Sequence, residues 1–404
     1  MDSPPRPANP RLYLWPMFLF ALSLRLAVVW VTARSHSADW FFGQATELAR
    51  LAESLRTGHG LSSPFGGSTG PSAFLSPAYP AIVAAIFAIF RPYSYASFVA
   101  LTSLQAVFGA ATVWVLMLMT RRVFGNSAAN LAGVIWAICP PALWLPILFW
   151  ETSLSILLAT SVVSLSLYCV DNSTRRVWVF TGSFAAFALA VNPSLLPIIV
   201  CCMGWAIYQC RSHSFSAPAM GVLVCVLLST PWAIRNFEQL HAFIPLRSNM
   251  GYELWQGNRP GSDGFFAPEF HPNVNSAEFA RYQALGEVDY MREKSAVAKG
   301  IILADPAKFM TLTIRRAFYF WTGIVRHSAA LVVAYIVATS TLGFAGLVLL
   351  WRRNRPLALF FLLPLLLFPA PYYITHPDFR FRLVIDPILT ALTACLFTRR
   401  NYSN

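Results

Sequence analysis

Long apolar runs, separated by short polar segments that contain arginine, fill most of this chain. Several runs reach about 20 residues, the length of helix that crosses about 30 Å of hydrocarbon. Their apolar residues are continuous instead of alternating, which excludes a membrane β-barrel. We therefore predict an all-α polytopic membrane protein with about ten spans, at residues 12–33, 96–119, 128–148, 154–170, 177–191, 195–208, 217–234, 331–350, 357–374 and 383–397.

The first long polar interruption, residues 35–80, follows the first predicted span directly. It should begin with one amphipathic helix, because Trp40, Phe41, Leu48, Leu51, Ala52 and Leu55 recur at steps of three and four residues. Glu47, Arg50 and Glu53 would then lie on or near the opposite face. Gly58 and Gly60 should end the helix, and a loop rich in Gly, Ser and Pro follows. This pattern places an acidic group at a membrane face beside a flexible loop.

Two apolar stretches are expected to lie in the membrane interface. Residues 78–90 are too few to span, and residues 309–323 are aromatic but contain Arg315 and Arg316.

We divide the chain into three regions. Residues 1–234 form a transmembrane half whose first outer loop (34–95) carries the candidate catalytic acid, residues 235–328 form an outer loop region, and residues 329–404 form the last transmembrane helices.

Charge then predicts the orientation of the chain. It carries 30 Lys and Arg against 17 Asp and Glu, a formal net charge of +13. With both termini in the cytoplasm, every short inner loop holds arginine, as the positive-inside rule requires, provided that residues 78–90 do not span. These arginines are Arg6, Arg11, Arg121, Arg122, Arg175, Arg176, Arg211, Arg352, Arg353, Arg355, Arg399 and Arg400.

This topology brings four polar features to the outer face: residues 35–80, the turn at Glu151, residues 235–308 and the loop at 375–382. A transporter would instead place its polar residues near the middle of the membrane, on broken helices. The basic excess fits cytoplasmic loops and membrane lipids, and no nucleic-acid-binding motif is present. Scarce lysine and arginine-rich inner loops favour a bacterial inner membrane.

Cysteine and histidine provide little chemistry in this sequence. The seven cysteines lie within or at the ends of apolar runs, and none lies in a predicted outer loop, so a disulfide framework is not expected. Neither cysteine nor histidine shows the spacing of a metal site, and no Gly-rich phosphate loop follows a strand. The candidate chemistry therefore rests on carboxylates and arginines.

Glu47 and Glu151 are the candidate catalytic acids. Glu47 could act as a general base that deprotonates an acceptor, or it could be a solvated carboxylate paired with Arg50. Asp39 is a competitor for the same role, or the residue that caps the helix N-terminus. Glu151 could line the same outer cavity, or it could lie beside a helix N-terminus, where negative charge suits the helix dipole.

Arginines outside the membrane suggest a phosphate site. Arg380 and Arg382, with His376, suit a phosphate ligand because guanidinium groups bind its oxygens in pairs, and Arg247 can be interpreted in the same way. The alternative is ordinary contact with anionic headgroups. Near Arg247 lie side chains that could stack on and hydrogen-bond a sugar, or that simply form turns, namely Asn249, Trp255, Gln256 and Asn258.

Five stretches of the chain resemble the GT-C superfamily of membrane glycosyltransferases, most closely the bacterial relatives of dolichyl-phosphate-mannose protein mannosyltransferases (glycosyltransferase family 39-like). They are ELARLAESLRTGHGLSSPFGGSTGPSAFLSPAYP, RRVFGNSAANLAGVIWAICPPALWLP, WETSLSILL, PWAIRNFEQLHAFIPLRSNMGYELWQGN and HPDFRFRLVIDP. The resemblance extends over nearly the whole chain. Each motif is loose, but their order and spacing are fairly specific.

The resemblance implies a sugar donor linked to polyprenyl phosphate, an inverted product and an active site on the outer face. It implies Glu47 as base, although many relatives carry Asp a few residues earlier, where this chain has Gly43. Glu151 matches an acidic residue after the third span, and Arg380 and Arg382 fall where contacts to the lipid phosphate are expected. The acceptor could be a lipid, a glycan or a protein. Some relatives use a divalent metal, and this sequence specifies none.

Three other functions remain consistent with these features. A transporter or flippase of lipid-linked sugars would show inverted repeats, and no clear repeat is visible. A polysaccharide ligase or polymerase would use the same kind of donor but transfer a glycan chain. A scaffold without activity would tolerate replacement of Glu47.

Overall fold

The computed structural model describes residues 11–210, 215–324 and 329–398. Within these ranges the chain is helical and has no strand, apart from one isolated bridge between Ser62 and Pro71. This confirms the predicted all-α fold. The N-terminal and C-terminal residues, with Arg6, Arg211, Arg399 and Arg400, lie outside the described residues.

Seven helices in the described part of the chain are long and apolar enough to cross a membrane. They are α1 (Leu14–Ser35), α5 (Tyr95–Phe124), α8 (Thr152–Asp171), η3 with α10 (Pro193–Leu195, Leu196–Cys210), α11 (Ser216–Leu240), α15 (Ala330–Arg353) and α16 with α17 (Arg355–Leu367, Ala370–Ile374). Seven of the ten predicted spans coincide with them. The protein is therefore an integral membrane protein.

The other three predicted spans are shorter or broken. The run at 128–148 forms α6 (Asn126–Ala137), α7 (Pro140–Trp144) and η2 (Leu145–Ile147), and the two parts meet at a bend of 54°. Pro140 and Pro141 cause the break, because proline starts a helix more easily than it continues one. The runs at 177–191 and 383–397 form α9 (Arg175–Val191, 17 residues) and α19 (Asp386–Leu396, 11 residues).

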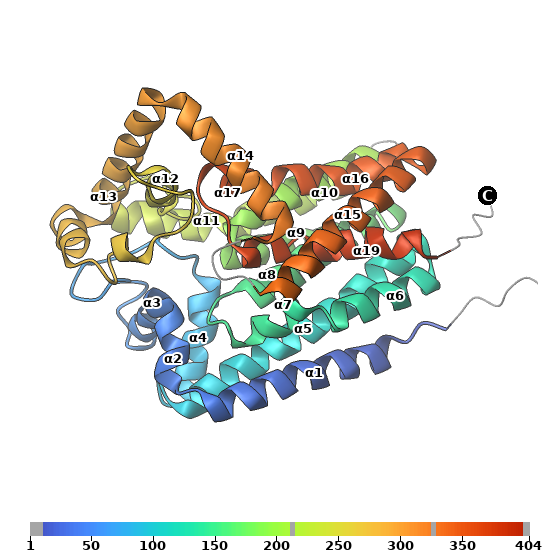
Figure 1. The fold of residues 1–404 in the computed structure, drawn as a ribbon, viewed down its shortest axis with the longest axis horizontal. Coiled ribbons are helices and arrows are strands. Elements are labelled where there is room, and N and C mark those ends of the chain that lie inside the picture. Colours follow the sequence, from blue (N-terminus) through green and yellow to red (C-terminus); the bar gives the residue numbers. More distant parts are fainter. Residues whose placement is uncertain (1–10, 211–214, 325–328, 399–404) are drawn as a thin grey trace, which may run out of the picture.

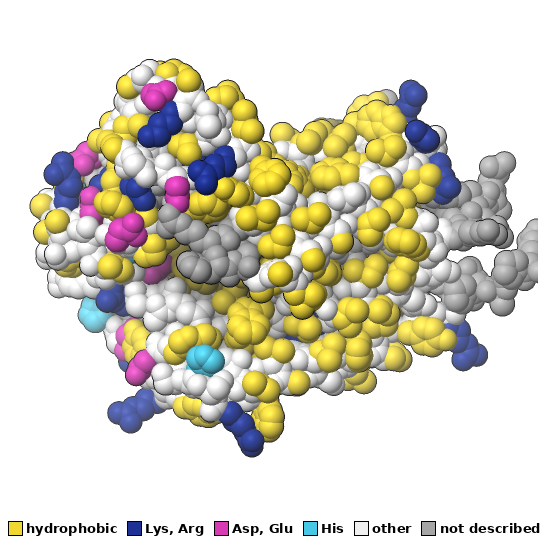
Figure 2. Space-filling model, viewed as in Figure 1, with side chains coloured by type: hydrophobic (Ala, Val, Ile, Leu, Met, Phe, Trp, Pro, Cys, Tyr) yellow, Lys and Arg dark blue, Asp and Glu magenta, His cyan; other side chains and the backbone are white. Residues whose placement is uncertain are grey.

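The apolar helices lie side by side and form a bundle with two distinct ends (Figure 1). At one end α1 begins and α19 ends, and at the other lie α3 (Thr46–Arg56), α12 (Met250–Asn258), α13 (Ser276–Ala304) and α14 (Pro306–Thr322). We call the second the loop end. On the face shown in Figure 2, hydrophobic side chains cover the middle of the molecule and charged side chains gather toward the ends. Acidic side chains are visible only at the loop end.

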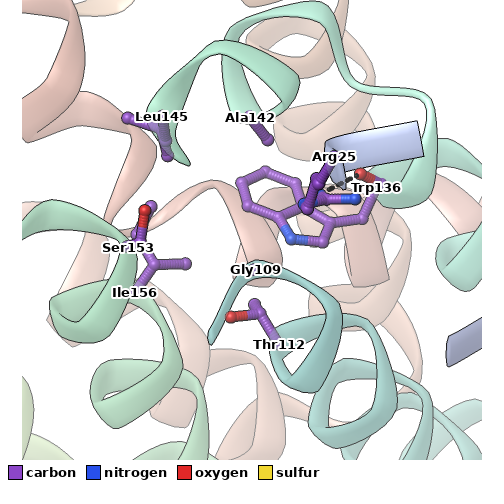
Figure 3. Close-up of a pocket in the computed structure, with 8 residues that line it drawn as sticks. All are labelled: Arg25, Gly109, Thr112, Trp136, Ala142, Leu145, Ser153 and Ile156. Carbon is purple, nitrogen blue, oxygen red and sulfur yellow. Dashed lines mark hydrogen bonds between the residues drawn. The ribbon is translucent and has the colours of Figure 1, made fainter. Parts of the chain in front are cut away.

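Arg25 of α1 stabilises the broken helix from inside the bundle. Its side chain is fully buried and donates to the carbonyl oxygens of Ala21 (3.1 Å), Ala137 (3.3 Å) and Trp136 (3.3 Å). The last two carbonyls belong to the final turn of α6, where the helix leaves acceptors without intrahelical donors, and the carbonyl of Trp136 also accepts from the backbone N–H of Cys139 (3.4 Å). Figure 3 shows Arg25 over Trp136, beside a space of only about 10 Å³. The guanidinium thus replaces backbone hydrogen bonds that water cannot supply here.

The first polar segment does not form the single helix that the periodicity predicts. It forms α2 (Ala38–Phe42), a 3₁₀ turn η1 (Gly43–Ala45) and then α3, which ends at Arg56 before Gly58. The turn changes the helix phase, so Trp40 is exposed and Glu47 is only 7% exposed. The prediction that Glu47 faces away from the apolar side is therefore wrong. Ala78–Ile89 forms α4. At 1.5 Å per residue this helix is about 18 Å long, which is too short to span a membrane, in agreement with the prediction.

The carboxylate of Glu287 connects the loop end to the first polar segment. It accepts hydrogen bonds from the backbone N–H of Ala73 (2.7 Å), from Ser248 (2.7 Å) and from Tyr282 (2.9 Å). Arg235 at the end of α11 donates to the carbonyl oxygens of Ser72 and Leu61, each at 2.8 Å. These contacts fix residues 61–73 against α13 and α11, directly before Phe74 and Leu75, which line the cavity described below.

Replacement of Arg25 by Met should destabilise the protein by about 2–4 kcal/mol, because the carbonyl of Ala137 loses its donor and that of Trp136 loses its side-chain donor inside an apolar bundle. We expect a lower midpoint in unfolding titrations of the purified protein with dodecyl sulfate. The control is Arg34→Met, which removes an exposed arginine of the same helix. Equal midpoints for the two variants would show that Arg25 does not support the broken helix.

Candidate active site

A cavity of about 670 Å³ opens at the loop end of the bundle. All four polar segments singled out from the sequence contribute to its lining. Residues 35–80 provide Gln44, Glu47 and Phe74, and the turn after η2 provides Trp150 and Glu151. Residues 235–308 provide Arg247, Asn249, Glu253, His271 and Asn273. Residues 375–382 provide His376, Asp378 and Arg380. These segments are far apart in the sequence and meet in one space.

Glu47 lies in the wall of the cavity on the first turn of α3. Its Oε2 accepts a hydrogen bond from Nδ2 of Asn273 (2.8 Å), whose Oδ1 accepts one from Arg50 (2.9 Å). Asn273 thus bridges the two residues, and Glu47 is not the solvated carboxylate of the alternative interpretation. Burial raises the pKa of Glu47, while the Asn273 hydrogen bond and the charges of Arg380 and Arg50 act in the opposite direction.

Glu151 and Arg247 form an ion pair in the same cavity. Nη2 of Arg247 lies 3.1 Å from Oε1 of Glu151, and both side chains are less than a fifth exposed. The guanidinium also donates to Ser76 (3.1 Å) and to the carbonyl oxygen of Val191 (3.3 Å). Glu151 occupies the N-cap position of α8 without a capping hydrogen bond from its side chain. The charges of Glu151 and Arg247 therefore balance each other.

Arg380 is the other arginine in the cavity wall. It follows Asp378, which caps the short helix α18 (Phe379–Leu383) and lies 3.4 Å from Nε of Arg380. The guanidinium lies over the ring of Trp150, 4.2 Å from its centroid. Stacking on an aromatic face holds a guanidinium while leaving its edge available to a ligand. Of the two arginines, Arg380 is therefore the better placed to bind an anion.

Glu253 and His376 form a hydrogen-bonded pair in the same wall. Nε2 of His376 lies 2.9 Å from Oε2 of Glu253, and Asn249 donates to Oε1 of Glu253 (3.1 Å). Burial raises the pKa of Glu253, but the hydrogen bond and charge of His376 outweigh it, so the net shift is downward. Burial also lowers the pKa of nearby His271 to about 4. The cavity thus holds a stabilised carboxylate and a neutral imidazole.

Five other residues named from the sequence do not line this cavity: Asp39, Trp255, Gln256, Asn258 and Arg382. Gln256 is fully buried and donates to Tyr252 (2.6 Å) and to the carbonyl oxygen of Ala267 (3.1 Å). Asp39 is exposed on α2, and the side chain of Ser37 caps that helix, so Asp39 does not act as its cap. The ring of Trp255 packs under Nζ of Lys294 (3.7 Å). Asn258 donates to the carbonyl oxygens of Leu254 and Ile374. The structure gives the last two a packing role.

Arg382 also points away from the cavity. It is fully buried, pairs with Asp386 one helical turn later and donates to Ser340 of α15. An arginine satisfied by a buried carboxylate has no charge left for a phosphate at the surface. Arg380 and Arg382 therefore have different surroundings, although the sequence suggests one role for both.

Several residues of the cavity were not predicted from the sequence. Asn273 and His271 lie in the irregular segment between η4 (Pro268–Phe270) and α13, and no periodicity marks them. Glu253 has a detectable signal, because it is the one acidic residue within MGYELWQGN. Trp150 directly precedes Glu151, where an aromatic beside an acid is a reasonable marker of a ligand site.

The described residues contain no group of three or more His, Cys, Asp or Glu side chains that could hold a metal ion. The carboxylates of the cavity are instead engaged with arginine, histidine and asparagine partners. The donor set therefore does not fit a metal site, and the chemistry below is derived without one.

No protein-family model and no curated protein matches this chain. Its fold is similar to solved structures of an oligosaccharyltransferase from Archaeoglobus fulgidus. One, tethered to an acceptor peptide with the NVT sequon, has a TM-score of 0.57 and 16% identity over 95% of this chain and 48% of that one. Another, AglB in complex with an inhibitory peptide and a dolichol-phosphate, has a TM-score of 0.57 and 14% identity over 95% and 49%.

ArnT from Cupriavidus metallidurans bound to undecaprenyl phosphate also matches, with 15% identity over 91% of this chain and 77% of that one. Its TM-score of 0.38 is too low to support an argument. This chain spans about half the length of the oligosaccharyltransferase. At such identities the likeness concerns the fold, and it agrees with the GT-C-like bundle predicted from the sequence.

The raised pKa of Glu47 can be tested by chemical labelling. Dicyclohexylcarbodiimide reacts with protonated carboxyl groups, so Glu47 should remain reactive to higher pH than Glu53, whose pKa is lowered by hydrogen bonds from Arg56. Asn273→Leu should extend the reactivity of Glu47 to still higher pH, because it removes a hydrogen bond that favours the carboxylate. Mass spectrometry of labelled peptides measures both. The assignment fails if Glu47 and Glu53 lose reactivity over the same pH range.

Proposed function

We propose that this protein is a membrane glycosyltransferase that moves a sugar from a polyprenyl-phosphate donor to an acceptor hydroxyl or amine, with inversion. The observation that carries the proposal is the presence of a buried carboxylate, Glu47, and a stacked guanidinium, Arg380, in the wall of one large cavity at the loop end of the bundle. One group can accept a proton and the other can bind an anion. A transfer from a phosphate leaving group needs both.

The likeness of fold supports the same class of reaction. The Archaeoglobus protein is an oligosaccharyltransferase, and one of its structures contains a dolichol-phosphate. A cavity at the end of an apolar bundle suits a lipid-linked donor, because the prenyl chain can remain among the helices while the phosphate reaches the polar loops. The cavity opens at the end opposite the one where α1 begins, which is consistent with an active site on the outer face of a bacterial inner membrane.

In the proposed mechanism Glu47 accepts the proton of the acceptor as the acceptor attacks the anomeric carbon. Its raised pKa makes the carboxylate a stronger base than an exposed one, once it is ionised. The bond between the anomeric carbon and the phosphate oxygen breaks in the same step, so the configuration inverts. Arg380 binds the departing phosphate. Arg247 contributes by holding Glu151, which keeps the acid from repelling the phosphate.

Sugar transfer by the purified protein from a panel of labelled polyprenyl-phosphate sugars tests this function. Glu47→Gln should lower the rate by about 100-fold or more, the usual contribution of a general base. Arg380→Ala should weaken binding of the donor, whereas Arg382→Ala should act through stability, because that side chain is buried with Asp386. The matched control is Glu53→Gln on the same helix, which should retain the rate.

Several results would contradict the proposal. Full activity of Glu47→Gln would place the base elsewhere. A product that carries a long glycan would favour a polysaccharide ligase or an oligosaccharide transfer like that named for the Archaeoglobus protein. If no donor is consumed while labelled lipid crosses the bilayer of liposomes, the protein is a transporter.

A further inference from the structure

Two buried nitrogen atoms in the wall of the cavity have no hydrogen-bond partner among the described residues. They are Nδ1 of His376, in the loop before α18, and Nε of Arg380, on α18 itself. Nε of Arg380 lies 3.4 Å from Asp378, an ion-pair contact without the geometry of a hydrogen bond. Buried polar atoms in folded proteins are normally satisfied. Two unsatisfied nitrogens four residues apart in one segment indicate a ligand that supplies oxygen atoms at this place.

The imidazole of His376 is held in one orientation. Glu253 accepts from its Nε2, and Asn249 donates to the second oxygen of that carboxylate. The rings of Phe266 and Phe381 lie near it, with centroids at 5.4 and 5.9 Å. A carboxylate on one ring nitrogen keeps a proton there and leaves the other nitrogen for chemistry, as in a carboxylate–histidine pair of an acid–base enzyme.

The backbone also fixes this loop against α12. A Cβ added to Gly257 would lie 1.8 Å from the carbonyl oxygen of Thr375, so only glycine permits this approach. Helix α12 carries Glu253 one turn before Gly257, and the loop carries His376 directly after Thr375. The close contact therefore sets the separation of the carboxylate and the imidazole.

We propose that His376 is a second catalytic residue, which donates a proton from Nδ1 to the departing polyprenyl phosphate, and that Glu253 is its positioning residue. This inference rests on the glycosyltransfer proposed above. It gives the cavity two proton-handling groups: Glu47 for the acceptor and His376 for the leaving group. Arg380, on α18 directly after that loop, binds another oxygen of that phosphate.

The proton balance of the step is complete without a further reactant. The acceptor loses its proton to Glu47 and forms a bond to the anomeric carbon. The bond from that carbon to the phosphate oxygen breaks, and its electron pair stays on the oxygen, which takes the proton from His376. Glu47 then releases a proton to water and His376 takes one up. The products are the glycoside and a singly protonated polyprenyl phosphate.

The charged groups around His376 favour this role. Glu253 faces it from α12, Asp378 lies in the same loop, and Arg380 lies on α18. His271, which interacts with Glu253 from the segment before α13, stays neutral because burial lowers its pKa to about 4. The carboxylate of Glu253 therefore contacts Nε2 of His376, and no second imidazolium competes for it.

Binding of a prenyl phosphate without sugar tests the phosphate contact apart from any transfer. The probe is geranylgeranyl monophosphate, with geranylgeraniol as the ligand that lacks phosphate, and titration calorimetry gives the affinities in nanodiscs at pH 6 and pH 8.5. We expect His376→Gln to bind the phosphate about tenfold more weakly than wild type at pH 6, the effect of one charge-assisted hydrogen bond, and the difference to shrink at pH 8.5. His59→Gln, an exposed histidine on the loop after α3, is the matched control.

Glu253→Gln provides a second variant in case His376→Gln does not fold, which a thermal unfolding curve will show. It should reduce the affinity difference between pH 6 and pH 8.5, because the imidazolium loses its carboxylate, while binding of geranylgeraniol stays unchanged. A protein whose packing alone is disturbed would lose affinity for both ligands. Equal phosphate affinity of wild type, His376→Gln and Glu253→Gln at both pH values would overturn the proposal, as would a wild type that binds no prenyl phosphate.

The pH profile of sugar transfer then separates the proton donor from a mere phosphate contact. Wild type should show a bell-shaped kcat/KM, with an acid limb from Glu47 and an alkaline limb from His376, and His376→Gln should lose only the alkaline limb. An unchanged alkaline limb overturns the proton donation. If wild type binds prenyl phosphate through His376 but transfers no sugar from any donor, the glycosyltransfer itself is wrong, and the proton donation fails with it.

Discussion

The guanidinium of Arg316 holds together the segments on which the cavity depends. It is fully buried on α14 and donates to carbonyl oxygens of Gly257, Gly264, Tyr373 and Ile374. It also donates to the side chain of Asn258. Gly257 lies at the end of α12, Gly264 lies in the segment before η4, and Tyr373 and Ile374 are the last residues of α17. One side chain thus joins α12, α14 and the loop that carries His376, in a region where an irregular backbone would otherwise have no partners.

The same solution recurs inside the bundle. Arg25 satisfies the end of α6, and Gln105 donates to the carbonyl oxygen of Leu148 (2.8 Å) in the turn that follows η2. Gln44 donates to the carbonyl oxygen of Ile147 (3.3 Å) and accepts from the N–H of Phe149 (3.2 Å). Gln44 also lines the cavity. The broken helix and the first polar segment are therefore coupled, and Trp150 and Glu151 reach the cavity because that coupling fixes their turn.

Long-range features of the fold could be predicted from the sequence, and contacts between polar residues could not. Apolar runs locate most helices because a lipid environment requires about 20 apolar residues in succession. Helix α19 is shorter than its apolar run suggests, since it begins only at Asp386, which pairs with Arg382, and Pro387 lies in its first turn. The position of Glu47 depended on one 3₁₀ turn, which no apolar period reveals. Asn273, which holds Glu47, lies 226 residues away and carries no local signal.

The ion-pair partners of the arginines could not be predicted from the sequence either. A sequence reveals that Arg247, Arg380 and Arg382 lie near polar segments, but not which carboxylate neutralises each. In the structure Glu151 engages Arg247 and Asp386 engages Arg382, both closely, whereas Asp378 stays at 3.4 Å from Arg380. An ion pair that is already satisfied gains little from a new anion, because the anion must replace the existing partner.

Among the acids of the cavity, the distribution of partners supports the proposal that Glu47 is the base. Glu151 has an arginine, Asp378 caps α18 and contacts Arg380, and Glu253 has a histidine and an asparagine. For Glu253 the hydrogen bond and charge of His376 outweigh burial and lower its pKa, which makes that carboxylate a weaker proton acceptor. Glu47 is buried and its side chain is hydrogen-bonded by the neutral amide of Asn273 at 2.8 Å, and burial outweighs the charges of Arg380 and Arg50, so its pKa is raised. A carboxylate in that state binds a proton more tightly than Glu253 does, which is the property that a general base requires.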